Sequence, residues 1–236
     1  ISLGNYHFGE VNGNEKRGVV SPIILPDLAI LDPSLTVGLP ANTTASTGID
    51  AMVHAIEAFA SKNINNNVIS RLMATEALSL LGRSIRLVVS DGSNIDARGE
   101  MLMGSMLAGI AFANSPVAAV HALAYPIGGT FHVSHGLSNA LVLPDVLRFN
   151  SSNEYAASAY AYLGKIVFPK ADMRGSDKKI AFMFSDQLQA LSEDLGLPTR
   201  LRDLKIPQEA CQQLAVDSMQ QTRLLVNNPR EMSESD

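Results

Sequence analysis

Residues 43–59 read TTASTGIDAMVHAIEAF, and this stretch decides the fold that we expect for the chain. Its apolar residues recur at three- and four-residue spacings, as they do on one face of an amphipathic helix. Asp50 and His54 are four residues apart, so a helix places both side chains on the same face. The helix is expected to begin at one of the hydroxyl side chains that are suited to capping it, Thr43, Thr44, Ser46 and Thr47.

The same periodicity continues through the rest of the chain. It predicts further helices over about 66–89, 96–113, 117–126, 136–148, 152–166, 176–194 and 207–226. The helix over 96–113 has almost no polar face, which predicts that it is buried inside a bundle. Pro126 with Gly128-Gly129 is expected to end one helix, and Pro144 to kink another. We therefore predict an all-α fold, a multi-helix bundle.

Strand and turn chemistry is confined to the N-terminal part of the chain. Residues 6–14 suggest a short β-hairpin with Asn12-Gly13 at its turn. Prolines 22, 26, 33 and 40 punctuate the connector that follows, in which residues 28–33 are a candidate short strand. We expect a hairpin and connector over 1–26 and one helical domain over 27–236.

Composition excludes several classes of protein. Of the 236 residues 46% are hydrophobic and 17% charged, the reverse of a disordered chain. The 18 basic residues are scattered among 23 acidic ones, which argues against nucleic-acid binding. No apolar run of about 18 residues is present, so no membrane span is expected. The single cysteine, Cys211, and the lack of a secretion signal predict a reducing, cytoplasmic environment.

Four of the five histidines fall in two short windows. His54 lies in the first, and residues 121–136 contain His121, His132 and His135. A carboxylate and two or three imidazoles suit a divalent first-row metal such as iron(II) or zinc. The residues alone leave other interpretations open: an Asp-His pair on a helix surface, core histidines, and a plain helix end at Gly128-Gly129.

Four ordered motifs resemble the iron-containing (group III) alcohol dehydrogenase family. The first two are Thr47–Ala58 and the histidine window about 65 residues later. The connector Pro26–Thr36 with Leu39-Pro40 is similar to the family's approach to the metal-binding helix, and Leu143–Asn150 to the segment after the last ligand. The resemblance implies the C-terminal helical domain of this family, a bundle of the dehydroquinate synthase-like type.

The resemblance also implies roles for individual residues. The family's metal ligands correspond to Asp50, His54, His121 and His135, with iron(II) as the metal and zinc as an alternative. A histidine that relays the proton in many members corresponds to Tyr125, whose reference pKa near 10 makes it a poor relay at neutral pH. His132 matches no ligand position and is interpreted as a histidine that lines the cleft.

Glu57 follows His54 by three residues on the expected helix. Two interpretations remain equal at this stage. Glu57 is either an acceptor that orients His54 toward the metal, or a charge in contact with solvent.

The resemblance further implies a nucleotide-binding domain that we do not find in this chain. No Gly-x-Gly-x-x-Gly motif occurs, and no strand–glycine–helix unit precedes the helices. We expect the chain to be the metal-binding half of an NAD(P)-dependent enzyme, inactive alone and unable to bind NAD(H) usefully. Its substrate would be a small alcohol, aldehyde or ketone. Its partners would be its own N-terminal domain and further copies of the protein. The alternatives are a metal-dependent hydrolase and a non-catalytic helical interaction module.

Overall fold

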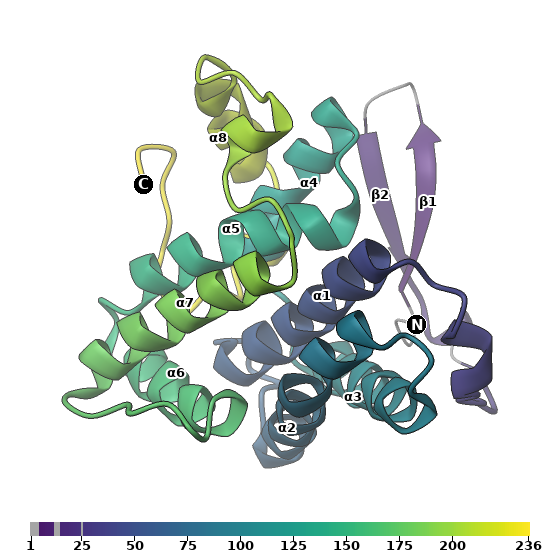
Figure 1. Cartoon of the computed structure of the whole chain (residues 1–236). Helices are drawn as coiled ribbons and strands as arrows, with labels where there is room; N and C mark the ends of the chain where they lie inside the picture. Colours follow the sequence, from purple (N-terminus) through teal and green to yellow (C-terminus); the bar gives the residue numbers. More distant parts are fainter. Residues whose placement is uncertain (1–4, 12–14, 25) are drawn as a thin grey trace.

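Helix α1 (Ala41–Ala60) runs through the middle of a bundle of helices in this computed structural model, which describes residues 5–11, 15–24 and 26–236 (Figure 1). It packs against α2, α3, α5 and α6. The other helices are α2 (Val68–Ser90), α3 (Ile95–Asn114), α4 (Ala119–Phe131), α5 (His135–Asn150), α6 (Glu154–Val167), α7 (Asp177–Asp194), α8 (Ala210–Met219) and α9 (Thr222–Leu225). The predicted all-α fold is confirmed.

Side-chain caps mark where four of these helices begin, α2, α3, α6 and α7. Asn67 accepts hydrogen bonds from Ile69 and Ser70 at the start of α2, and Asn94 accepts one from Ala97 at the start of α3. Asn153 and Ser176 cap α6 and α7 in the same way. Each cap satisfies a backbone N–H that has no partner within its own helix.

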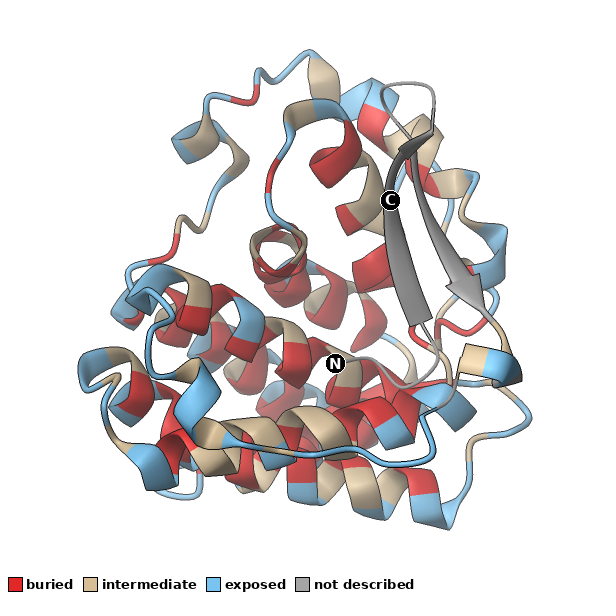
Figure 2. Cartoon of the chain, turned by 90° about the vertical axis from the view of Figure 1, so that its right-hand side faces the viewer, coloured by how far each residue is buried: buried red, intermediate tan, exposed pale blue. Residues whose placement is uncertain are grey.

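The core lies between the helices, on the faces that turn toward one another (Figure 2). Helix α1 supplies the largest share of buried residues, and small residues dominate its face. Small residues also bring α3 close to α2, because a Cβ added at Gly104 would lie 2.7 Å from Cγ of Leu81. Helix α1 lies at the centre of this packing, and it carries the first two candidate metal ligands.

The N-terminal segment forms two antiparallel strands, β1 (Asn5–Val11) and β2 (Glu15–Val20). Asn5 pairs with Val20, and the register is irregular between Phe8 and Val11. The Asn12-Gly13 turn lies outside the described residues. The short strand expected over residues 28–33 was wrong: this exposed segment has no partner strand, and a 3-10 turn follows at Pro33–Thr36, capped by Asp32.

The beginning of α1 also differs from the prediction. The helix begins at Ala41, after an extended Pro40, and none of the four hydroxyl residues caps it. Thr43 and Thr44 lie inside the first turns, and the hydroxyls of Ser46 and Thr47 donate to the Thr43 carbonyl instead. Ser and Thr side chains inside a helix commonly bond to the preceding turn in this way.

Two further helix boundaries were wrong. Helix α4 continues through Pro126 and both glycines to Phe131, and α5 and α8 pack along it. The single helix expected over 207–226 is instead α8 and α9, separated at Gln220-Gln221. Pro144 lies inside α5 as expected, and its carbonyl accepts from Ser185 at 2.7 Å.

Helix α3 is less buried than its apolar sequence indicated. Ala108, Ala111 and Phe112 pack into the core, whereas Met103 is 41% exposed and Ile110 38% exposed. A helix that is apolar on every side does not reveal which side faces the core. Among the described residues no single helix is long and apolar enough to cross a membrane, and α3 with α4 reaches that length only with a 107° bend between them.

Candidate metal centre

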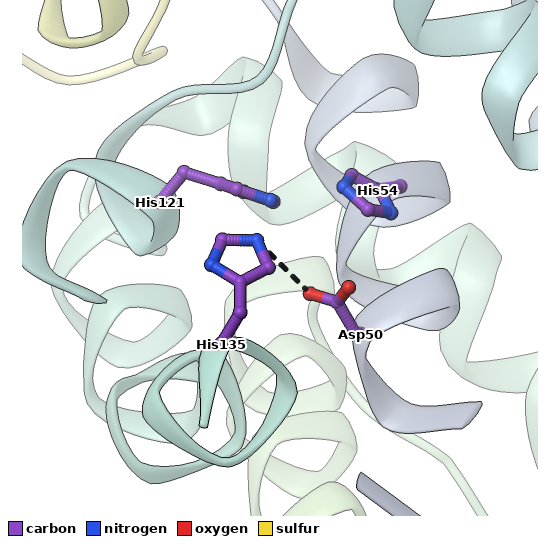
Figure 3. A group of neighbouring side chains, drawn as sticks. All are labelled: Asp50, His54, His121 and His135. Atoms are coloured by element: carbon purple, nitrogen blue, oxygen red, sulfur yellow. Dashed lines mark ion pairs between the residues drawn. The ribbon is translucent and has the colours of Figure 1, made fainter. Parts of the chain in front are cut away.

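Four side chains from three helices converge at the middle of the bundle. Asp50 and His54 come from one face of α1, His121 from α4, and His135 from the first residue of α5. One ligand atom of each lies within 4.8 Å of the other three. Figure 3 shows the four side chains directed toward a common point. All four residues proposed as ligands from the sequence are thus brought together.

Helices α1 and α5 approach each other very closely beside this group. Gly136, which follows His135, packs directly on α1: a Cβ at this position would lie 2.8 Å from the Ser46 carbonyl carbon and 3.3 Å from Cβ of Asp50. Only glycine fits such an approach without displacing one of the helices. Because glycine has no side chain, Nε2 of His135 comes within 3.7 Å of Oδ1 of Asp50.

Ring stacking orients the imidazoles. The ring of His54 lies between Phe112, with centroids 4.6 Å apart, and His121, with centroids 4.7 Å apart. Burial lowers the pKa of His54 to about 3, and the nearby Asp50 only partly opposes this shift. His54 is therefore neutral near pH 7, and the neutral imidazole is the form that binds metals.

The charge of Asp50 is stabilised by its neighbours. Burial works to raise the pKa of this carboxyl, but the three histidines and a hydrogen bond from Asn139 outweigh it, so the pKa lies below its usual value. Asp50 is consequently an ionised carboxylate at neutral pH. It supplies the negative charge that a divalent cation requires among neutral imidazoles.

Sequence reasoning missed Asn139, which lies at the focus of the group. Its Nδ2 donates to Oδ1 of Asp50 at 2.5 Å and lies 3.2 Å from Nε2 of His135 and 3.4 Å from Nε2 of His121. Asn139 is fully buried, and its Oδ1 has no hydrogen-bond partner among the described residues. Its position one helical turn after His135 was the only available signal.

These contacts test whether the group fits a cation. The Asp50 carboxylate and the Nε2 atoms of His121 and His135 surround one amide nitrogen, and in the tautomer that binds a metal both Nε2 atoms are acceptors, one more acceptor than the two N–H groups of an amide can serve. A charged carboxylate together with three imidazoles is the Asp and His donor set that suits iron(II) or zinc. The residues present therefore fit a divalent metal.

Glu57 orients a different histidine from the one expected. It is buried, with Oε2 2.6 Å from Nδ1 of His121, while Oε1 accepts from the backbone N–H of Val120 at 2.7 Å. Both sequence interpretations, an acceptor for His54 and a solvent-exposed charge, were wrong. Helical spacing identifies which residues share a face, but not which residue of another helix meets them.

Two other sequence candidates lie beside the four. Tyr125 is one turn after His121 on α4, with its ring centroid 5.9 Å from that of His135, and burial raises the pKa of its hydroxyl. His132 is exposed, ends α4 in the left-handed conformation with φ of 53°, and is not a member of the group. His135 is the first residue of α5, one residue before the predicted start of that helix.

Comparison with known proteins identifies relatives of this chain. The sequence model of the Fe-containing alcohol dehydrogenase family, C-terminal part, matches residues 44–236. Long-chain-alcohol dehydrogenase 1 of Geobacillus thermodenitrificans is 40% identical over 223 residues, which are 94% of this chain and 55% of that protein. A 1,3-propanediol dehydrogenase of Klebsiella pneumoniae is 36% identical over 92% of this chain and 55% of its own length. The chain thus spans about half the length of these relatives.

Several solved structures are also similar to this chain. A crystal structure of 1,3-propanediol oxidoreductase has a TM-score of 0.86 and 35% identity, covering 93% of this chain and 56% of that one. An alcohol dehydrogenase from Oenococcus oeni has a TM-score of 0.87 at 32% identity, with 94% and 56% covered. A third structure, sulfoacetaldehyde reductase of Bifidobacterium kashiwanohense in complex with NAD+, has a TM-score of 0.80 at 28% identity, with 94% and 55% covered.

Proposed function

Because the chain belongs to the Fe-containing alcohol dehydrogenase family, as its C-terminal domain, we propose that it is the metal-binding half of an NAD(P)-dependent alcohol dehydrogenase. The observation that carries this proposal is the convergence of one carboxylate and three imidazoles from three helices. The relatives with which it shares most of its length are dehydrogenases of alcohols. Neither a hydrolase nor a non-catalytic helical module gains support from them.

Asp50, His54, His121 and His135 hold the metal in this proposal, with iron(II) as the family name suggests and zinc as the second candidate. Bound there, the metal supplies a Lewis acid that polarises an alcohol or carbonyl oxygen. The protein's own contribution is to present a charged carboxylate and three imidazoles that point toward a common centre. Because these groups are held by packed helices, little reorganisation is needed when the metal binds.

Tyr125 occupies the position that the family resemblance assigns to a proton relay. Its raised pKa keeps the phenol protonated at neutral pH. A protonated phenol donates a hydrogen bond but does not readily give up its proton, so Tyr125 positions a substrate oxygen in preference to relaying a proton. His132, exposed at the end of α4, lines the approach to the site in this proposal.

The nicotinamide cofactor binds through an N-terminal domain that is not part of this chain. Support comes from the relatives, which are nearly twice as long, and from the similar reductase solved with NAD+. The substrate is a small alcohol or the corresponding aldehyde or ketone, and the intact enzyme is a cytoplasmic homo-oligomer. Fluorescence titration with NADH tests whether the cofactor binds through the other domain. Binding of NADH by this chain at micromolar concentrations would contradict that assignment.

Metal analysis tests the proposed site directly. The protein purified without a histidine tag is expected to hold about one divalent metal per chain, and His121→Ala is expected to hold none. His132→Ala is the matched control, because this histidine comes from the same segment but lies outside the group. Equal metal content in the wild type and His121→Ala would refute the ligand assignment.

A further inference from the structure

We propose that Glu57 is a positioning residue that fixes the tautomer and orientation of His121 and joins α1 to the start of α4. The inference rests on the proposed metal-binding function and adds a residue that binds no metal itself. It follows from the two contacts that the carboxylate makes and from the way α4 begins.

The contact with the imidazole determines where its hydrogen lies. Oε2 of Glu57 is 2.6 Å from Nδ1 of His121, and both side chains are almost wholly excluded from solvent. A carboxylate oxygen only accepts hydrogen bonds, so Nδ1 must carry the hydrogen. Nε2 of His121 then keeps its lone pair, and Nε2 is the atom that faces Asn139 and the other candidate ligands.

The second contact caps a helix from outside. Helix α4 begins at Ala119, and the residue before it, Ala118, provides no side-chain cap. The N–H of Val120, one of the first backbone donors of α4, donates to Oε1 of Glu57 at 2.7 Å. A negative charge at this end of a helix also interacts favourably with the helix dipole.

These two contacts link the parts of the metal centre. Glu57 follows His54 by one turn and Asp50 by two turns on α1, so all three lie on one face. His121 is the residue after Val120, so Glu57 holds two neighbouring residues of α4 at once. The carboxylate therefore positions α4 relative to the two ligands of α1 and aims the third ligand at them.

The substitution Glu57→Gln separates the two contacts. The backbone N–H of Val120 can only donate, so the amide oxygen must stay on Val120 and the amide NH2 must face His121. The NH2 group is a donor, so it favours the His121 tautomer with a lone pair at Nδ1 and the hydrogen at Nε2. That hydrogen points at the metal position. The cap of α4 is retained, while the ligating lone pair is lost.

Zinc titration of the metal-free protein and histidine NMR provide the test. Zinc affinity is expected to fall 10–100-fold in Glu57→Gln, as for other partners of metal-bound histidines. Long-range 15N–1H spectra of the metal-free protein, at a pH where the imidazole is neutral, are expected to place the His121 hydrogen on Nδ1 in the wild type and on Nε2 in the variant. A purely structural role for Glu57 would not exchange the tautomer.

The exposed Glu76 on α2 provides the matched control, and Glu76→Gln should change neither measurement. Zinc affinity of Glu57→Gln within twofold of the wild type would overturn the proposal. So would a wild-type His121 with its hydrogen on Nε2, and this result does not require the variant to fold. A wild type that binds neither zinc nor iron(II) would refute the proposed function instead, while the tautomer of His121 would still decide the role of Glu57.

Discussion

Replacing Gly136 by alanine is expected to push α5 away from α1 and to weaken both the fold and metal binding. The new Cβ would lie 2.8 Å from the Ser46 carbonyl carbon and 3.3 Å from Cβ of Asp50. The Ser46 carbonyl oxygen would lie closer still, and ordinary contact begins at 3.4 Å, so the helices must separate by at least about 0.6 Å. No side-chain rotation relieves this contact, because the nearest atoms belong to the backbone of α1.

The expected size follows from two opposing effects. Overpacking of a well-packed core costs about 1–3 kcal/mol. Alanine recovers up to about 1 kcal/mol, because it favours the helix more than glycine does. A net loss of about 1–2 kcal/mol corresponds to a melting temperature lower by roughly 2–8 °C in a protein of this size.

Metal binding is expected to respond more strongly than stability. His135 precedes Gly136 and moves with α5, whereas Asp50 and His54 stay with α1. Metal–ligand distances tolerate deviations of only about 0.2 Å, so a displacement of at least about 0.6 Å should weaken zinc binding at least tenfold. Zinc titration against a competing chelator measures this loss, and thermal melting of the metal-free protein measures the change in stability.

Gly99→Ala is the matched control. Gly99 also lies inside a helix, α3, but a Cβ there meets only Pro33, at 4.0 Å. This substitution is expected to leave zinc affinity unchanged and to maintain or raise the melting temperature. Wild-type stability and affinity in Gly136→Ala would refute the idea that the close approach of α1 and α5 sets the geometry of the site.

Two further substitutions test polar groups buried in the core. Asn139→Asp places a second carboxylate next to Asp50, because the Asn139 amide nitrogen lies 2.5 Å from the Asp50 carboxylate. An uncompensated buried charge costs several kcal/mol, so the melting temperature of the metal-free protein should fall by at least about 5 °C. Zinc should raise the melting temperature of this variant by more than it raises that of the wild type, and an equal increment would contradict the location of Asn139 at the centre of the ligands. The hydroxyl of Tyr160 accepts a hydrogen bond from Asn150, and burial raises the pKa of this hydroxyl. The folded state therefore keeps a proton that the unfolded chain loses above pH 10. The free energy of unfolding should therefore fall as the pH rises above 10, by about 1 kcal/mol at pH 11 from this group. In denaturant unfolding, Tyr160→Phe should lose less stability with rising pH than the wild type. An equal loss in both proteins would exclude Tyr160 as the cause.

The sequence was most informative where local chemistry sets the structure. Helices α2 to α7 begin within two residues of the predicted positions, because the three- and four-residue spacing of apolar residues marks each of them. It was least informative where contacts between distant segments outweigh local preference. Pro126 and the two glycines after it would end an isolated helix, yet α4 continues, and α5 and α8 pack along it.

The same distinction applies to the metal centre. Ligand types and spacings pointed to four residues that the structure brings together, because chemistry restricts which side chains bind a first-row metal. The partners of those residues are not restricted in this way. Glu57 and Asn139 are ordinary helix residues by sequence, and each acquires its role from a residue 64 or 89 positions away.

Helix geometry nevertheless narrows the choice of partners once the ligands are placed. Seven residues make almost two full turns, so Glu57 points in nearly the same direction as Asp50, toward α4 and α5. A charged side chain on that face must be paired, because leaving it unpaired beside the core would cost several kcal/mol. His54, one turn earlier on the same helix, already stacks between Phe112 and His121. The groups that remain within reach of Glu57 are Nδ1 of His121 and the start of α4, which has no side-chain cap. A carboxylate two turns after a ligand on a buried helix is therefore better interpreted as a partner for the facing helix than for its own.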